Sequence, residues 1–369
     1  MAELSFGNKV FSPSSPLVIA EIGTGHGGDL DKAGELVGAA AAAGADCAKF
    51  QCVFAEEIIH PATGFVPLPG GDSPLFDVFA ALERDRDFYR HLKEMTEQAG
   101  LLFLCTPFGA KSADLLAGIG VAAMKIASPE LNHLPLLERV ASFRLPTFVS
   151  SGVSTLGDIE RALGILSGPQ VVLLHCVTAY PAPAEDYNLR LLESYARLFG
   201  IPVGVSDHSL DPVLVPALAV CHGASVVEKH ICLSRSDPGL DDPIALDPKA
   251  FAKMRQAIAR AALDPRSARA ALEDEYGAEL VDATSGTGRK VLAPSEAANY
   301  GRTNRSVHAL VDIAPGDELT RDNTALLRTE KKLRPGLEPG QWSWILGRMA
   351  RLAIPAGEGI RPEDVGDFA

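Results

Sequence analysis

The chain has 369 residues, of which 47% are hydrophobic and 22% are charged, and its formal net charge is −13 at pH 7. This composition is typical of a globular protein with one large and one small domain. The acidic balance, without a long run of either sign, argues against nucleic acid or an anionic membrane surface as a partner. Residues 1–16 lack the features of a signal peptide, and the longest bland stretch, 37–44, is far shorter than the roughly 20 residues of a membrane span.

The six cysteines indicate a reducing compartment. They are Cys47, Cys52, Cys105, Cys176, Cys221 and Cys232, and none forms a C-x-x-C pair. Most lie in or beside apolar runs, which is typical of buried thiols in a cytoplasmic protein. A zinc site built from cysteines is the less favoured alternative.

Short β-rich runs recur along the chain, with helical stretches between them. The runs cover residues 17–22, 46–51, 101–105, 121–126, 146–150, 171–176, 202–206 and 225–230. One helix is predicted from about Asp29 to Gly44 and another from about Asp85 to Gly100. A glycine just beyond a helix supplies the left-handed conformation that ends it. Further helices are predicted to end at Gly120, Gly168, Gly200 and Gly223.

The alternation of strands and helices predicts a parallel sheet. Eight repeats within about 250 residues favour a (β/α)8 TIM barrel, an α/β fold. The main alternative is a doubly wound open sheet. The glycine-rich stretch 21–28 follows the first strand, but its spacing is wrong for the G-x-G-x-x-G of a Rossmann loop.

The chain changes character after the eighth helix. Residues 1–263 form the predicted barrel domain, and the polar stretch 264–302, interrupted by Pro and Gly, is predicted to be a linker. In residues 303–369, strand-like pieces alternate with turns such as "APGD". A domain of this size is marginally stable alone, so we expect it to pack on something.

Polar side chains lie at the end of each predicted strand, whereas apolar residues fill its beginning. In a barrel, the C-terminal ends of the strands form the mouth where substrates bind. The terminal side chains include Glu21, Lys49, Gln51, Thr106, Lys125, Ser128, Glu130, Ser150, Ser206, His208, Glu228 and His230. This one-sided gradient predicts an active site at that end.

Two histidines at neighbouring strand ends are candidate metal ligands. Alternate residues of a strand point the same way, so His208 shares a side with Ser206, and His230 shares one with Glu228. Strands seven and eight are neighbours in a barrel, which brings both imidazoles to a similar height. The pair could bind one divalent cation, with water and substrate completing its shell. Two hydrogen-bonded structural histidines are the alternative.

Lys49 and Lys125 lie inside apolar strands, where an ammonium group is costly to bury unless it meets an anion. Together with the hydroxyl groups of the strand ends, they would suit a ligand with a phosphate and a carboxylate. Salt bridges to the strand-end glutamates inside the barrel are the alternative.

The sequence resembles a known family in a series of ordered motifs. These are "EIGTGHGGDLDKA", "AKFQ", "CTPF", "KIASPE", "SSGV", "HCVTAYPAP", "GVSDHS", and "EKH" followed by "DPGLDD". The order is that of the sialic acid (N-acetylneuraminate) synthases. The tail "NRSVHALVDIAPGDELTRDN" resembles the antifreeze-like, SAF-type domain attached to those enzymes.

The resemblance implies a reaction and its cofactor. The enzyme would condense phosphoenolpyruvate with an N-acetyl sugar aldehyde and water, releasing phosphate and a nine-carbon 2-keto acid. A divalent metal, Mn²⁺ or Mg²⁺, would bind His208 and His230. Glu21 would act as a general acid or base, although a structural role beside Lys49 is nearly as well supported.

The resemblance also implies which residues hold the substrates and a homodimeric partner. The phosphoenolpyruvate residues would be Lys49, Thr106, Lys125, Ser128, Ser150, Thr178 and Ser206. The sugar residues would be Gln51, Glu130, Tyr180, Asp241 and Arg305. Arg305 would reach from the tail domain into the barrel of the other subunit of a swapped dimer.

Some positions depart from the family pattern, and some questions stay open. Gly25 stands where the family has Asn, which puts the role of His26 in doubt, and Thr178 stands where relatives have Asn or Ser. The loop 52–84 is equally consistent with a lid, disorder or a partner contact. The resemblance leaves the acceptor open between N-acetylmannosamine and a 2,4-diacetamido-6-deoxyhexose. The alternatives are a condensing enzyme with another acceptor class and a non-catalytic scaffold.

Overall fold

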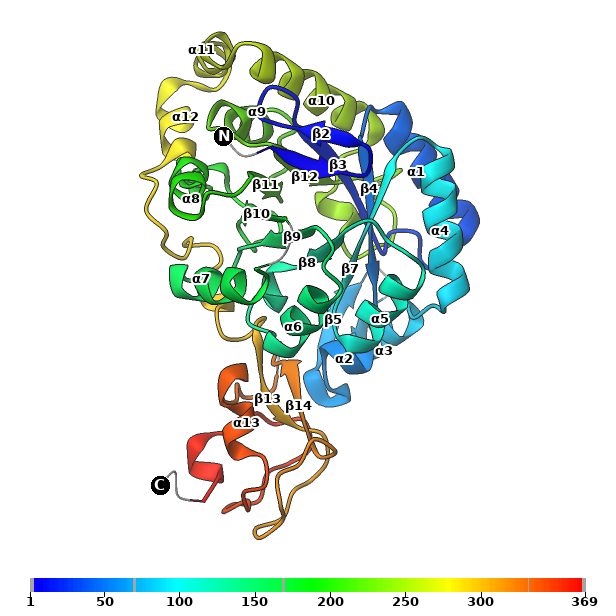
Figure 1. Ribbon diagram of the computed structural model, residues 1–369, viewed down its shortest axis with the longest axis vertical. Coiled ribbons are helices and arrows are strands. Elements are labelled where there is room, and N and C mark those ends of the chain that lie inside the picture. Colours follow the sequence, from blue (N-terminus) through cyan, green and yellow to red (C-terminus); the bar gives the residue numbers. More distant parts are fainter. Residues whose placement is uncertain (1–2, 69–70, 168–169, 331, 367–369) are drawn as a thin grey trace.

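The computed structural model of the chain describes residues 3–68, 71–167, 170–330 and 332–366. A large barrel contains most of these residues, and a small unit formed by the C-terminal part extends below it in Figure 1. Among the described residues, no helix is both long and apolar enough to cross a membrane.

Eight parallel strands form the barrel, and all eight were predicted. They are β3 (Leu17–Gly23), β4 (Cys47–Cys52), β7 (Leu102–Pro107), β8 (Met124–Ile126), β9 (Thr147–Ser150), β10 (Val171–Cys176), β11 (Val203–Asp207) and β12 (Val226–His230). Their hydrogen-bonded order is β7-β4-β3-β12-β11-β10-β9-β8. Strands β7 and β8 lie side by side and complete the ring without a paired ladder between them in the described part of the chain. The predicted TIM-type barrel is therefore confirmed, in a nearly closed form.

Helices surround the sheet, as the strand–helix alternation predicted. They are α1 (Leu30–Ala42), α4 (Arg86–Gln98), α5 (Ala110–Gly118), α6 (Leu134–Ser142), α7 (Leu156–Ile165), α8 (Leu191–Phe199), α9 (Leu214–Cys221) and α10 (Pro248–Leu263). Asp29 begins α1 by accepting from the backbone N–H groups of its first turn. Gly200 ends α8 at φ 66°, the left-handed cap that glycine adopts without strain. The predicted helix end at Gly168 lies outside the described residues.

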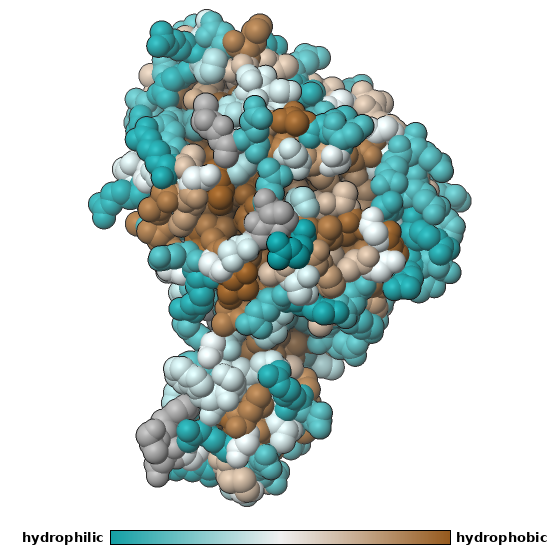
Figure 2. All heavy atoms as spheres, in the orientation of Figure 1, coloured by the Kyte–Doolittle hydropathy of each residue, from teal (hydrophilic) through white to brown (hydrophobic). Residues whose placement is uncertain are grey.

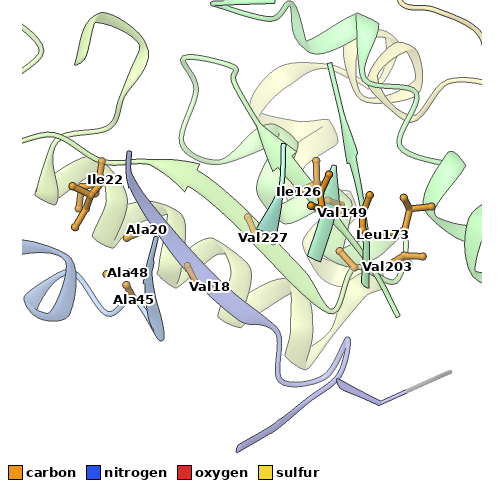
Figure 3. Close-up of a cluster of buried hydrophobic side chains, with 14 of the residues drawn as sticks. Val18, Ala20, Ile22, Ala45, Ala48, Ile126, Val149, Leu173, Val203 and Val227 are labelled. Atoms are coloured by element: carbon orange, nitrogen blue, oxygen red, sulfur yellow. The ribbon is translucent and has the colours of Figure 1, made fainter. Parts of the chain in front are cut away.

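The side chains of each strand alternate between two cores. Val18, Ala20 and Ile22 of β3 face the helices, together with Ala48 and Val227 (Figure 3). The helices turn hydrophilic faces to solvent, as the rim formed by α1 and α4 shows in Figure 2. This is the division that amphipathic helices on a buried sheet require.

The inward side chains near the strand beginnings form a second core. Leu17 and Ile19 pack there against Leu4, Phe6 and Phe11. The last three come from a hairpin of β1 (Leu4–Phe6) and β2 (Lys9–Phe11), which the sequence analysis did not predict. The hairpin fills one end of the barrel with apolar groups, so only the other end is available for chemistry.

The segment predicted to be a linker contains two helices. They are α11 (Pro265–Tyr276) and α12 (Ala278–Ser285), and both lie against α9 or its neighbours. Leu272 and Val281 belong to the barrel core. The stretch predicted to be a linker is therefore helical in residues 265–285, and Ala268, Tyr276 and Leu280 also pack against the barrel core.

The loop 52–84 is folded rather than open. It contains α2 (Ala55–Ile58), β5 (Phe65–Leu68), β6 (Gly71–Pro74) and α3 (Leu75–Ala81). Ile58, Ile59 and Leu75 pack with Phe108 in a small apolar cluster. His60 and Thr63 contact the tail domain through hydrogen bonds with Leu310 O and Lys332 N. The loop therefore links the barrel mouth to the tail.

The tail domain is small and β-rich. Strands β13 (Arg305–Ala309) and β14 (Thr324–Arg328) pair antiparallel, and α13 (Trp342–Ile345) follows. Val307, Leu319, Ile345 and Ile360 belong to its own core. Seven short 3-10 turns complete the described elements: Pro61–Thr63, Ser128–Glu130, Ala184–Asp186, Asp242–Ile244, Ala297–Asn299, Pro339–Gln341 and Pro362–Asp364.

Candidate active site

A cavity of about 330 Å³ lies at the carboxyl ends of the barrel strands. It is lined by most of the residues that the sequence analysis singled out. These are Glu21, Lys49, Gln51, Lys125, Ser128, Ser150, Thr178, Tyr180, Ser206, His208, His230 and Asp241. Thr106, Glu130 and Arg305 are the predicted site residues that do not line it.

A chain of alternating charges crosses the cavity floor. Lys49 Nζ lies 3.0 Å from Glu21 Oε2 and 3.3 Å from Glu228 Oε1. Lys125 Nζ lies 3.3 Å from the same Glu228 oxygen and donates to Ser150 Oγ at 2.7 Å. The salt bridges proposed as the alternative for these lysines are therefore present. Both ammonium groups nevertheless line the cavity, so they also remain available to an anionic ligand.

Burial and neighbouring charge determine how firmly these groups are ionised. Burial opposes the charge of Lys49, but Glu21 and Glu228 raise its pKa well above the usual range. Burial also opposes ionisation of Glu228, yet Lys125 and Lys49 lower its pKa to about 2. At Lys125, burial lowers the pKa despite the nearby Glu228. Lys125 therefore has the most to gain from an added negative charge.

Hydroxyl groups surround the two ammonium groups. Ser206 donates to Glu228 Oε1 at 2.9 Å, and Thr106 accepts from Lys49 Nζ at 3.5 Å from behind the cavity wall. Thr178 Oγ1 is buried and has no hydrogen-bond partner among the described residues. A buried hydroxyl without a partner is uncommon, and here it lines the cavity, where a ligand oxygen could accept from it.

His208 and His230 lie beside each other at the cavity, with ring centroids 5.7 Å apart. His208 Nδ1 lies 2.8 Å from Val177 O. Because a carbonyl can only accept, this contact puts the proton on Nδ1 and leaves the lone pair of the neutral ring on Nε2. His230 Nδ1 faces Asp241 Oδ2 at 3.8 Å, and Tyr180 stacks on His208 with centroids 4.3 Å apart. The predicted juxtaposition of the two rings is present.

Comparison with known proteins identifies the family of both domains. Residues 36–266 match the NeuB family, and residues 304–366 match the SAF domain. The chain belongs to the NeuB family. Its members include the sialic, legionaminic and pseudaminic acid synthases, and here the barrel is followed by a C-terminal SAF domain.

Individual relatives match over almost the whole chain. The uncharacterized protein MJ1065 of Methanocaldococcus jannaschii is 34% identical, with 94% of each chain covered. The N,N'-diacetyllegionaminic acid synthase of Legionella pneumophila is 32% identical, with 92% of each covered. The crystal structure of the spore coat polysaccharide biosynthesis protein SpsE of Bacillus subtilis superposes with a TM-score of 0.82 at 31% identity, covering both chains fully.

This NeuB-family chain offers two imidazole ligands for a divalent cation. In their neutral forms the two rings offer lone pairs, and metal–nitrogen bonds of roughly 2.1 Å are compatible with their separation. Burial opposes the charge of His208, but Cys176 and the Val177 carbonyl raise its pKa to about 9, so a cation would displace a proton from this ring. Among the described residues, no group of three His, Cys, Asp or Glu side chains is arranged to hold a metal. Two imidazoles alone would hold an ion weakly and leave its other positions to water and substrate.

Glu130 and Arg305, both predicted to face the sugar, instead bind each other. Arg305 Nε lies 2.5 Å from Glu130 Oε2, and Arg328 Nη2 lies 2.5 Å from Glu130 Oε1. Arg305 also donates to the carbonyls of Glu57 and Phe108. Within the single chain described, Arg305 therefore lies at the mouth of the barrel that precedes it in the sequence. The cluster fastens the tail to the barrel, and Arg328 takes the place at the cavity wall that was predicted for Arg305.

Several cavity residues were not identified from the sequence. Val53, Ile58, Phe79 and Phe108 form an apolar wall, and the connector and tail supply Asn299, Thr303, Arg328 and Glu330. Most lie outside the strand ends on which the analysis was based. The only signal in the sequence was the apolar character of residues 53–59 and 75–79 within an otherwise polar loop.

Proposed function

We propose that the protein condenses phosphoenolpyruvate with an N-acetylated hexose aldehyde and water, giving a nine-carbon 2-keto sugar acid and phosphate. The observation that supports this best is the composition of one cavity. Two buried lysines, a set of hydroxyls and two imidazoles line it together. Phosphoenolpyruvate carries two anionic groups, and an aldehyde acceptor needs a group that activates its carbonyl. A cavity of this composition suits both substrates.

The lysines and hydroxyls of the cavity would hold phosphoenolpyruvate. Lys49 and Lys125 are the cations for its phosphate and carboxylate, with donors from Ser128, Ser150 and Thr178. Charge-assisted hydrogen bonds of this kind are about twice as strong as neutral ones. A bound anion would also stabilise the charged form of Lys125, whose pKa is lowered by burial.

His208 and His230 would hold the divalent cation, Mn²⁺ or Mg²⁺. When bound, such an ion polarises an aldehyde carbonyl as a Lewis acid, worth several kcal/mol of barrier. The protein's own part is to fix the two rings: Val177 O sets the tautomer of His208, and the Tyr180 ring covers it.

The bond changes balance without a further reactant. C3 of phosphoenolpyruvate bonds to the aldehyde carbon, whose oxygen gains a proton. Water then adds to C2, and phosphate leaves as the 2-keto group forms. The lysines and hydroxyls stay within reach of the negative charge throughout, and each such donor is typically worth about 10²–10³-fold in rate. Glu21 accepts from Gln51 Nε2 at 2.9 Å and pairs with Lys49, so we assign it to holding these two residues in place.

The apolar wall favours a particular acceptor. Val53, Ile58, Phe79 and Phe108 would contact methyl groups rather than hydroxyls. A 2,4-diacetamido-6-deoxyhexose has one more acetamido methyl than N-acetylmannosamine and a methyl group at C6. Burial of one such group is worth about 0.8 kcal/mol, roughly fourfold in binding.

Phosphate release from phosphoenolpyruvate tests the proposal. The assay is run with N-acetylmannosamine and with the 2,4-diacetamido-6-deoxyhexoses, each with and without a chelator. We expect acceptor-dependent, chelator-sensitive release, with kcat/KM highest for a diacetamido acceptor. Absence of release with every acceptor would favour a scaffold, and release with only a sugar phosphate would favour another class of condensing enzyme.

Gly152 provides a sharper test of the anion site. A Cβ at this position would lie 2.1 Å from Thr178 Oγ1 and 2.9 Å from Ser128 Oγ. We expect Gly152→Ala to displace these hydroxyls and raise the Kd for phosphoenolpyruvate about 100-fold. A displacement of about 1 Å in a positioned group typically has an effect of this size. Isothermal titration measures the change.

Gly157→Ala is the matched control for that substitution. Gly157 lies in α7, and its added Cβ would come no closer than 3.8 Å to Thr155 Oγ1. Alanine is favoured over glycine in a helix, so this variant should bind phosphoenolpyruvate as the wild type does. Equal affinity for all three proteins would refute the placement of the anion at Ser128 and Thr178.

The homodimer with exchanged tails stays a prediction, because the same contacts could form between two chains. It is tested by mixing two inactive variants. His208→Ala damages only the barrel, and Arg328→Ala damages only the tail contribution. If tails are exchanged, mixed dimers contain one intact composite site, and activity returns on co-refolding. If each tail serves its own barrel, the mixture stays inactive.

A further inference from the structure

The connector between α12 and β13 lies against the loops that follow three barrel strands. Polar side chains of its residues 293–304 bind the loops after β9 and β10, and the Arg305 carbonyl that follows accepts from Asn132 beyond β8. These three loops include the hydroxyls of Ser128 and Thr178 and the turn at Gly152. The connector contributes most of these contacts through three side chains: Glu296, Asn299 and Asn304.

Glu296 is buried, with only 1% of its surface exposed. Its Oε2 accepts from the backbone N–H groups of Val153 at 2.9 Å and Thr178 at 2.8 Å. Its Oε1 accepts from Ala293 N at 3.3 Å and lies 3.8 Å from Lys290 Nζ. One carboxylate oxygen thus joins two loops that are far apart in sequence.

Two asparagines complete the attachment. Asn299 donates from Nδ2 to Thr178 O at 3.2 Å, and Asn304 donates from Nδ2 to Val153 O at 3.0 Å. The connector therefore satisfies both the N–H and the C=O of Val153 and of Thr178. Neither loop residue can shift without breaking contacts to the connector.

The position of the two loops determines where the hydroxyl groups at the cavity wall lie. Val153 has φ 43°, a left-handed conformation that is strained for a β-branched residue and persists only where surroundings hold it. Next to it, Gly152 donates to Ser128 Oγ at 3.0 Å. The Thr178 hydroxyl lies so close to Gly152 that even a methyl group there would overlap it. A small displacement of either loop would move the hydroxyls at the cavity wall.

We propose that Glu296 is a positioning residue for the phosphoenolpyruvate end of the active site, acting through the backbone of Val153 and Thr178. The proposal rests on the function proposed above. It gives the connector a role in catalysis: a side chain outside the barrel strands sets the hydroxyl donors inside the cavity. Glu296 itself does not line the cavity, so it need not touch the substrate.

Glu296→Gln is the test. A carboxylate accepts at both oxygens, whereas an amide accepts at one and donates at the other. In either orientation the glutamine NH₂ faces a backbone N–H, toward Ala293 or toward the two loops. We expect the Kd and KM for phosphoenolpyruvate to rise about 10–100-fold, the range typical of supporting residues. The KM for the sugar acceptor should stay within about twofold.

Ser295→Ala is the matched control, because Ser295 Oγ is buried in the same connector without a hydrogen-bond partner among the described residues. It should leave both KM values unchanged. Asn304→Ala is the second variant; it removes only the bond to Val153 O and the acceptor for Gly301 N. It should shift the KM for phosphoenolpyruvate in the same direction, and it decides the matter if Glu296→Gln does not fold.

The outcomes are distinguishable by isothermal titration with phosphoenolpyruvate, together with the KM for the acceptor. Tight binding by the wild type and weak binding by Glu296→Gln supports the proposal. Equal binding overturns it, and so does a parallel loss for phosphoenolpyruvate and acceptor, which indicates general destabilisation. If the wild type itself does not bind phosphoenolpyruvate, the proposed function fails, and this proposal fails with it.

Discussion

His208→Ala is expected to lower turnover by on the order of 10³-fold or more while leaving the fold intact. The variant removes one of two imidazoles that would hold the cation, and a Lewis acid worth several kcal/mol corresponds to such a factor. Phosphate release measures turnover, and titration with Mn²⁺ followed by electron paramagnetic resonance measures ion binding. Far-ultraviolet circular dichroism and thermal melting report on the fold.

The matched control is His91→Ala, at an exposed histidine on α4 that contacts only the backbone carbonyl of Asp87 among the described residues. It should affect neither turnover nor Mn²⁺ affinity. Full activity in His208→Ala, or unchanged Mn²⁺ affinity with lost activity, would contradict the metal assignment. The second result would make His208 a substrate contact instead.

Glu130→Gln is expected to lower the free energy of unfolding by about 3–5 kcal/mol, the usual result of removing one partner from a buried ion cluster. Glu130 and Arg305 are fully buried, and Arg328 is nearly so. The neutral amide would leave the buried Arg305 guanidinium without its paired carboxylate and Arg328 with only Glu330 among the described carboxylates, 3.8 Å away. Urea unfolding at pH 7 measures the change.

Asp114→Asn is the control for an exposed ion pair. Asp114 lies 2.6 Å from Arg139, but both side chains are almost half exposed. Solvent screening limits such a pair to about 1 kcal/mol or less. A Glu130→Gln effect no larger than this would show that the cluster is not what fastens the tail.

The effect of Glu130→Gln should also depend on pH. Burial would raise the pKa of Glu130, but Arg305 and Arg328 hold it well below its ordinary value. A depressed pKa contributes stability above the unfolded value of about 4.3, and that contribution is lost as the pH falls toward the folded pKa. The stability difference between wild type and Glu130→Gln should therefore be complete at pH 7 and shrink below about pH 4. A difference independent of pH would contradict the assigned charge.

The sequence predicted the strand ends well because strand geometry is local. In "VGVSDHS", Ser206 and His208 face the cavity, whereas Asp207 points outward and pairs with Lys229 at 2.6 Å. This alternation follows from the twofold period of a strand and needs no tertiary information. The same rule places Glu228 and His230 inward on the neighbouring strand.

The contacts made by the loops and the connector could not be predicted from strand period. Nothing periodic marks Glu296, which acts through backbone atoms of residues more than 100 positions away. Glu130 and Arg305 were each assigned to the sugar, but in the folded chain they are near enough to neutralise each other. An ion pair between distant residues depends on how the tail is seated, and residue type alone does not encode that.

By itself, the sequence determined that the protein is a parallel barrel with lysines, hydroxyls and two histidines at one end, because strand period and chain direction fix which side chains meet there. Only the tertiary structure decided which of them bind one another, which apolar loop residues form the cavity wall, and that the connector holds the loops at Val153 and Thr178. Those arrangements depend on contacts between segments far apart in the chain, where small differences in packing and charge select one pairing among many.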